Sequence, residues 1–154
     1  MDAATTSLDR PGNGVDTSRL AEAILDQIAD AVIYADEKGI IRRWNQAAAA
    51  VFGYSPAQAI GSSLDLIIPE HLRAAHWRGF ETAMTRGVMK LEGRPTLTRA
   101  VHQSGRKVYV EMTFALVKDQ GGAVRGAVAV ARDATERIQQ QRAEARRETS
   151  KEQS

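Results

Sequence analysis

The sequence contains no cysteine among its 154 residues. This excludes disulfide bonds, zinc–thiolate sites, thiol catalysis and any cysteine-linked chromophore. No apolar run approaches the roughly 20 residues that a membrane-spanning helix needs, and the N-terminus lacks the basic start and apolar segment of a signal peptide. We therefore expect a cytoplasmic protein that does not insert into a membrane.

An excess of charge of one sign is also missing. The 21 Lys and Arg residues are interleaved with 19 Asp and Glu residues, which leaves a formal net charge of +2. Nucleic-acid binding needs a one-sided basic patch, so we expect no nucleic-acid partner. The sequence has no phosphate-binding glycine loop, no HExxH motif and no supported Ser/His/Asp arrangement, and it predicts that the protein is not an enzyme.

The polarity pattern divides the chain into four segments. The start is rich in Thr, Asp, Gly and Pro without a period, which is typical of a flexible tail. Leu20, Ile24 and Ile28 then recur at helical spacing, with Ser18 as the expected N-cap. The predicted segments are a flexible tail at 1–17, a flanking helix at 18–30, one domain at 31–132 and a polar exit helix at 133–154.

Within the central domain, alternation and turn residues predict strands at both ends and helices between them. The helices are expected after the caps Asn45 and Ser55 and from Pro69 to about Thr85. The expected strands are 31–35 and 40–45, which form a hairpin, and then 88–100, 107–117 and 124–131.

The expected helix at Pro69 places a histidine on its apolar side. Leu72, His76, Phe80 and Met84 are four residues apart and share one face. An imidazole in that place must pair with a protein group, stay as a costly buried polar ring, or coordinate a bound group.

The order of elements, together with several short motifs, resembles the PAS family of sensor domains. The motifs are Asp36-Glu37-Lys38-Gly39, Trp44-Asn45-Gln46-Ala47-Ala48, Phe52-Gly53-Tyr54-Ser55, Ile60-Gly61 and Arg132-Asp133-Ala134-Thr135-Glu136. The resemblance implies an α+β PAS fold, with a five-stranded antiparallel sheet, helices packed on one face, and flanking N- and C-terminal helices.

Within that family, LIIPEHLRAAHWRGF, EGR and HQSGRKVYVEMTFALVK are similar to the haem-binding oxygen sensors of the FixL and direct-oxygen-sensor type. The resemblance implies that haem b binds through His76, that Arg94 on the next strand faces a bound diatomic gas such as oxygen, and that apolar side chains wall the pocket. The wall residues expected on this basis include Leu72, Phe80, Met84, Met112, Phe114, Leu116 and Val128.

Several alternatives remain open on the sequence. His76 can be a core histidine bonded to a backbone carbonyl, and Arg94 can pair with Glu92 or Glu111. Trp44 and Tyr54 can stack on a flavin, or the pocket can take another small ligand. A cofactor-free interaction domain is the alternative from a different class. Amphipathic flanks favour a homodimer, and a sensor of this type implies a downstream kinase, cyclase or regulator.

Overall fold

The computed structural model describes residues 16–154 and has an antiparallel sheet of five strands in the order β2-β1-β5-β4-β3. The long strands β4 and β5 and the short strand β1 form its centre, with β2 and β3 at the edges. The prediction of an α+β fold built on such a sheet is confirmed. The strands are β1 (Ala31–Asp36), β2 (Ile41–Trp44), β3 (Thr96–Val101), β4 (Lys107–Lys118) and β5 (Val124–Asp133).

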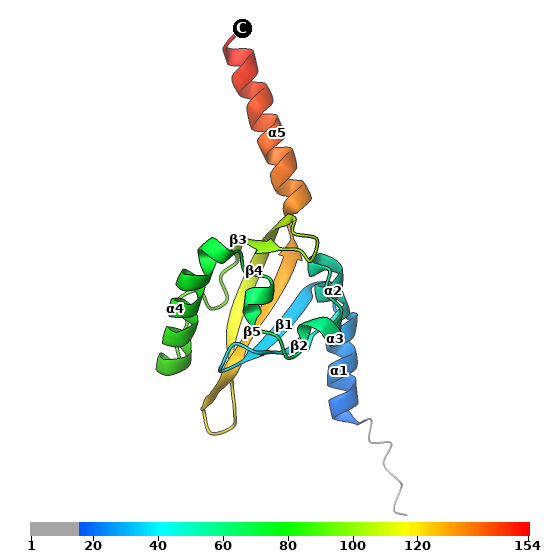
Figure 1. Cartoon of the computed structure of the whole chain (residues 1–154), viewed down its shortest axis with the longest axis vertical. Coiled ribbons are helices and arrows are strands. Elements are labelled where there is room, and N and C mark those ends of the chain that lie inside the picture. Colours follow the sequence, from blue (N-terminus) through cyan, green and yellow to red (C-terminus); the bar gives the residue numbers. More distant parts are fainter. Residues whose placement is uncertain (1–15) are drawn as a thin grey trace, which may run out of the picture.

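The helices connect β2 to β3 and extend from both ends of the sheet. Figure 1 shows α4 at the left of the sheet, α2 and α3 at the right, and α5 projecting away from the domain. No helix within residues 16–154 is long and apolar enough to cross a membrane. The helices are α1 (Thr17–Gln27), α2 (Gln46–Phe52), α3 (Pro56–Ala59), the 3₁₀ turn η1 (Leu64–Leu66), α4 (Glu70–Arg86) and α5 (Thr135–Glu152).

Local sequence signals explain where the short helices begin and end. The Asn45 side chain accepts a hydrogen bond from the Ala48 amide and caps α2, and Ser55 and Gln58 form a complete capping box on α3. Gly53 ends α2 with φ = 81°, a left-handed conformation that glycine adopts without a steric cost. These predicted caps are confirmed.

Two predicted boundaries are wrong. The first helix begins at Thr17 and is capped by Asp16, whose carboxylate accepts from the Ser18 amide, so Ser18 is not the cap. The other predicted tail residues, 1–15, lie outside the described residues. The predicted strand at 88–100 begins only at Thr96, because the preceding residues form turns closed by backbone bonds from Glu92 to Met89 and from Arg94 to Leu91.

The register of β4 and β5 assigns their side chains to two faces. Met112, Phe114 and Leu116 of β4 lie opposite Ala131, Ala129 and Ala127 of β5. Met112 and Ala131 belong to the main core cluster, and Phe114 and Ala129 pack against it, so this set marks the inner face of the sheet. The residues between them, among them Tyr109, Glu111 and Val128, point to the outer face, because side chains alternate along a strand.

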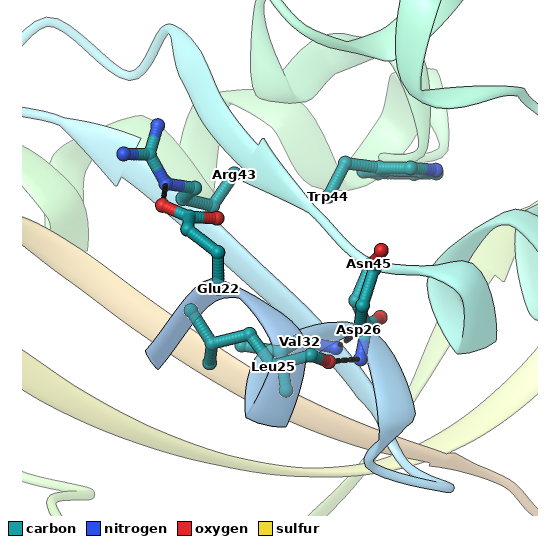
Figure 2. Close-up of a pocket in the computed structure, with 7 residues that line it drawn as sticks. All are labelled: Glu22, Leu25, Asp26, Val32, Arg43, Trp44 and Asn45. Carbon is teal, nitrogen blue, oxygen red and sulfur yellow. Dashed lines mark hydrogen bonds and ion pairs between the residues drawn. The ribbon is translucent and has the colours of Figure 1, made fainter. Parts of the chain in front are cut away.

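The buried Asn45 side chain fastens the end of α1 to the domain, and an exposed ion pair between Glu22 and Arg43 joins α1 to β2. Asn45 is 4% exposed, and its amide group donates to the backbone oxygens of Leu25 and Asp30 while its oxygen accepts from the amides of Val32 and Ala48. Figure 2 shows Asn45 pointing toward α1 from the end of β2. All the hydrogen-bonding capacity of this buried amide is therefore used, which fixes the end of α1 against β1 and α2.

Candidate functional site

The candidate site is the apolar face of α4, and the first half of this helix is fixed by polar contacts to the segment before it. The Trp77 indole nitrogen donates to the Asp65 carboxylate at 2.8 Å. Arg73 donates to the backbone oxygens of Ile68 and Asp65. A Cβ added at Gly39 would collide with the Trp77 ring, so this ring packs directly on the turn between β1 and β2. These contacts set the rotation of α4 and hence the direction of its other side chains.

His76 lies on α4 next to these anchors. Its ring is edge-on to the Trp77 ring, with centroids 4.8 Å apart, and it stacks on Phe80 at 5.9 Å. The Nδ1 atom is buried and has no hydrogen-bond partner among residues 16–154. The alternative of a core histidine whose Nδ1 is bonded to a backbone carbonyl is therefore not what the structure shows.

Burial lowers the pKa of His76 below its usual value of 6.5, and the Asp65 carboxylate opposes this shift. A lowered pKa favours the neutral imidazole, in which one ring nitrogen keeps a free lone pair. A neutral imidazole is the form that binds a metal ion. Within residues 16–154 no three His, Asp or Glu side chains come together as a metal-ligand group.

The other predicted wall residues are partly gathered and partly misplaced. On α4, Leu72, Phe80 and Met84 are half-buried, and on the inner face of β4 Met112 is buried while Phe114 and Leu116 are half-buried. Val128 lies opposite Tyr34 and Ala115 on the outer face of the sheet. Including Val128 in the wall was therefore wrong, since neighbouring residues of a strand point to opposite faces.

Arg94 is not on a strand. It is exposed and lies in the turn before β3, so the prediction that it sits on the next strand is wrong. The segment that carries it is tied to β4 by a bridge between Glu92 and Phe114 and by a hydrogen bond from the Gly93 amide to the Phe114 oxygen. Glu111 pairs with Arg137, which removes it as the expected partner of Arg94.

The residues considered for flavin stacking serve the core. Trp44 is 4% exposed, packs on Phe52 and donates from its indole nitrogen to the Tyr54 backbone oxygen. A cavity of about 30 Å³ lies beside Trp44, between α1 and β2 (Figure 2). This volume holds a few water molecules at most, so the cavity is far too small for a cofactor.

The anchors of α4 were not identified from the sequence. Trp77 contacts both Asp65 and Gly39, the latter across 38 residues of chain, and no spacing rule connects positions that far apart. The only sequence features that pointed to this contact were Gly39 in the hairpin turn and Trp77 directly after His76.

Comparison with known proteins finds relatives of this chain among sensor proteins. A 54-residue stretch is 41% identical to the sensor protein FixL of Bradyrhizobium diazoefficiens and covers 35% of this chain and 11% of that protein. The oxygen sensor protein DosP of Escherichia coli is 25% identical over 97 residues, which is 63% of this chain and 12% of DosP. The chain spans less than a fifth of the length of the curated relatives it matches.

A solved structure and a family model agree with the fold. The crystal structure of a PAS domain from Colwellia psychrerythraea superposes with a TM-score of 0.67 at 21% identity, covering 79% of this chain and 99% of that one. The family model described as the PAS fold matches residues 19–134. PAS domains are generally sensory or interaction modules rather than enzymes. The chain described here belongs to the PAS family.

Proposed function

We propose that this PAS domain is a sensory module that binds haem b through His76 and responds to oxygen or another diatomic gas. The observation that carries the proposal is the buried, unpartnered Nδ1 of His76 on an otherwise apolar helix face. Leaving such an atom without a partner costs on the order of 1–3 kcal/mol. A ligand that bonds to Nδ1 itself would offset this cost.

The inner face of the sheet offers apolar surface that a flat ligand could cover. The inner face of β5 carries alanines, and Ala127, Ala129, Phe114 and Leu116 are all half-buried rather than buried. Large apolar side chains that stay half-exposed are a source of free energy for a ligand that covers them. These side chains would contact the macrocycle, and haem iron would supply the position at which a gas molecule binds.

The protein's own contribution is to keep the His76 imidazole neutral and to fix its orientation. Burial favours the neutral ring, while Trp77 and Arg73 fix the rotation of α4 through Asp65. The similarity to FixL and DosP supports the same assignment, because both names describe sensors and DosP is named as an oxygen sensor. Their full activities belong to much longer proteins, and a kinase, cyclase or regulator as downstream partner is part of this proposal.

Haem titration of the purified protein tests the proposal. We expect one equivalent of haem to give a Soret band, with loss of tight binding in His76→Ala and no change in His71→Ala. His71 is the matched control because it is an exposed histidine on the same helix. A wild-type protein that takes up no haem, or a His76→Ala variant with an unchanged spectrum, would contradict the proposal. A bound flavin spectrum would favour the small-ligand alternative.

The second candidate function is a cofactor-free dimerisation module, and α1 favours it. Leu20, Ile24 and Ile28 are 48%, 52% and 38% exposed along one stripe of this helix. An exposed apolar stripe of this kind is typical of a helix that pairs with another surface. Sedimentation of Ile24→Ser, with Ala23→Ser as the control, tests this. A dimer that dissociates only in Ile24→Ser supports the candidate, and a wild-type monomer contradicts it.

A further inference from the structure

We propose that the open edge of β3 is a docking site for an extended, acidic segment of a partner protein, which adds to the sheet as a sixth strand. The strand order places β3 at one edge of the sheet and β2 at the other. Docking at β3 is independent of haem binding, because it uses backbone groups at the edge of the sheet rather than side chains of α4.

The edge of the sheet at β2 is covered by the chain itself. The Ile41 amide donates to the Ser62 oxygen at 2.9 Å, and the Gly61 amide donates to the Ile41 oxygen at 2.8 Å. A bridge also joins Ile40 to Ser63. This segment therefore occupies the edge along the start of β2, which blocks the addition of another strand there.

The end of β3 shows which of its backbone groups point outward. The Val101 amide donates at 2.9 Å to the oxygen of Ile67, which precedes α4 and is not part of the sheet. In an antiparallel pair the backbone groups of every second residue point in the same direction. The amides and carbonyls of Leu97 and Arg99 therefore also point away from β4.

These outward groups have no partner in the part of the chain that the structure describes. The hydrogen bonds among residues 16–154 include none from the Leu97 or Arg99 amides and none to their backbone oxygens. Both residues are exposed, Leu97 by 49%. The opening is short, because Pro95 has no amide proton and Ile67 already binds Val101. An added strand would thus bond to two residues of β3.

The charges around this edge favour an acidic partner. The exposed basic residues along it are Arg94, Arg99, Arg106 and Lys107. None of them takes part in the ion pairs described for residues 16–154. Glu111, which lies opposite Leu97, already pairs with Arg137. Even with Glu92 before β3, the edge therefore keeps an excess of positive charge that an acidic strand would neutralise.

An antiparallel partner strand uses both the backbone groups and the charges. It exchanges hydrogen bonds with Leu97 and Arg99, and the side chains of its bonded residues lie on the same face as theirs. Acidic side chains at those positions lie beside Arg99. The residues between them lie beside Thr96 and Thr98, where β-branched side chains suit an extended strand. The backbone bonds supply affinity, and the acidic side chains determine which segment binds.

A capped peptide of alternating glutamate and valine tests the docking site in the whole chain. At a peptide concentration ten times its Kd, hydrogen exchange at the Leu97 and Arg99 amides should slow about tenfold. Exchange at Thr98, whose amide faces β4, should not change. Methylation of the glutamate nitrogens removes the bonds to β3 and should weaken binding by about tenfold or more. Methylation of the valine nitrogens is the matched control, because these face solvent in the docked strand.

Charge reversal gives an independent check. Arg99→Glu should lose the glutamate–valine peptide and bind a peptide of alternating lysine and valine instead. Arg147→Glu is the matched control, because Arg147 is an exposed arginine on α5 without an ion pair among residues 16–154. It should bind both peptides as the wild type does. Circular dichroism melting curves establish that each variant is folded.

Four results would overturn the proposal. The first is a folded wild-type protein that does not bind the glutamate–valine peptide. The second is equal binding of the two methylated peptides, because the attraction would then depend on charge alone. The third is an equal loss of binding in Arg147→Glu. The fourth is slow exchange at Leu97 and Arg99 that appears without peptide and increases with protein concentration, which would assign the edge to a second copy of this chain.

Discussion

Replacing Asn45 by alanine should remove the main polar link between α1 and the rest of the domain. The substitution breaks four hydrogen bonds of 2.8–3.0 Å at once. The amides of Val32 and Ala48 are in buried residues and would lose their acceptor. The oxygens of Leu25 and Asp30 are in a less buried place and are closer to water.

The magnitude follows from these two groups of partners. Each buried amide left without an acceptor costs on the order of 1–3 kcal/mol. Loss of the N-cap of α2, already counted through Ala48, costs about 1 kcal/mol in other helices. The backbone oxygens of Leu25 and Asp30 add little to the free-energy loss because water can replace the lost donor. We therefore expect Asn45→Ala to lower the free energy of unfolding by about 3 kcal/mol.

Urea unfolding measures this loss, with Gln46→Ala as the matched control. Gln46 is the next residue, is exposed, and makes no described side-chain hydrogen bond, so its replacement should change the free energy by less than about 0.5 kcal/mol. Hydrogen exchange should also show faster exchange in α1 for Asn45→Ala alone. A loss below about 1 kcal/mol, or unchanged exchange in α1, would refute the role assigned to Asn45.

Three further predictions concern the α4 region. Because burial lowers the pKa of His76, the unfolded chain takes up a proton at this residue before the folded chain does, so stability should fall as pH drops below about 6.5. In His76→Leu, urea titrations between pH 7.5 and pH 5 should show a smaller fall, and an identical fall would contradict the assignment. Trp77→Phe removes the hydrogen bond to Asp65 and should cost about 1–2 kcal/mol in the same assay; a neutral effect would mean that this bond does not anchor α4. Gly39→Ala adds a Cβ against the Trp77 ring at φ = 77° and should lower the free energy of unfolding by about 2 kcal/mol; a melting temperature equal to that of the wild type would refute this packing.

The features of the fold that were predicted correctly from the sequence are set by residues close together in the chain. Asn45 and Ser55 each cap a helix by accepting from the amide three residues later, and the turn at Gly39 joins adjacent strands. Such signals act over short distances and can be recognised from type and spacing.

The errors have physical causes of a different kind. Val128 is apolar and so was assigned to the pocket, but the pairing register with Ala115 turns it to the outer face. Val88 and the residues after it are consistent with a strand by composition, yet two turns occupy that segment and leave Arg94 exposed. Register and tertiary bonds decide these cases, and neither is visible in a single sequence.

The candidate site likewise has one part that the sequence predicted and one part that only tertiary contacts determine. The helical spacing of Leu72, His76 and Phe80 identified one face of α4, and that face is where the unpartnered Nδ1 lies. The anchors that rotate this face into place, Trp77 and Asp65, depend on a contact across 12 residues and a loop. Their importance became visible only in three dimensions.

Imidazole rescue of His76→Gly tests the central claim most directly. The variant should fold, bind haem weakly and lack the axial nitrogen signature of the wild type. Added imidazole should enter the space left by the side chain and restore the Soret band and the ferrous carbon monoxide spectrum, with no effect on His71→Gly. A His76→Gly protein whose haem spectrum already equals that of the wild type without imidazole would contradict axial ligation by His76.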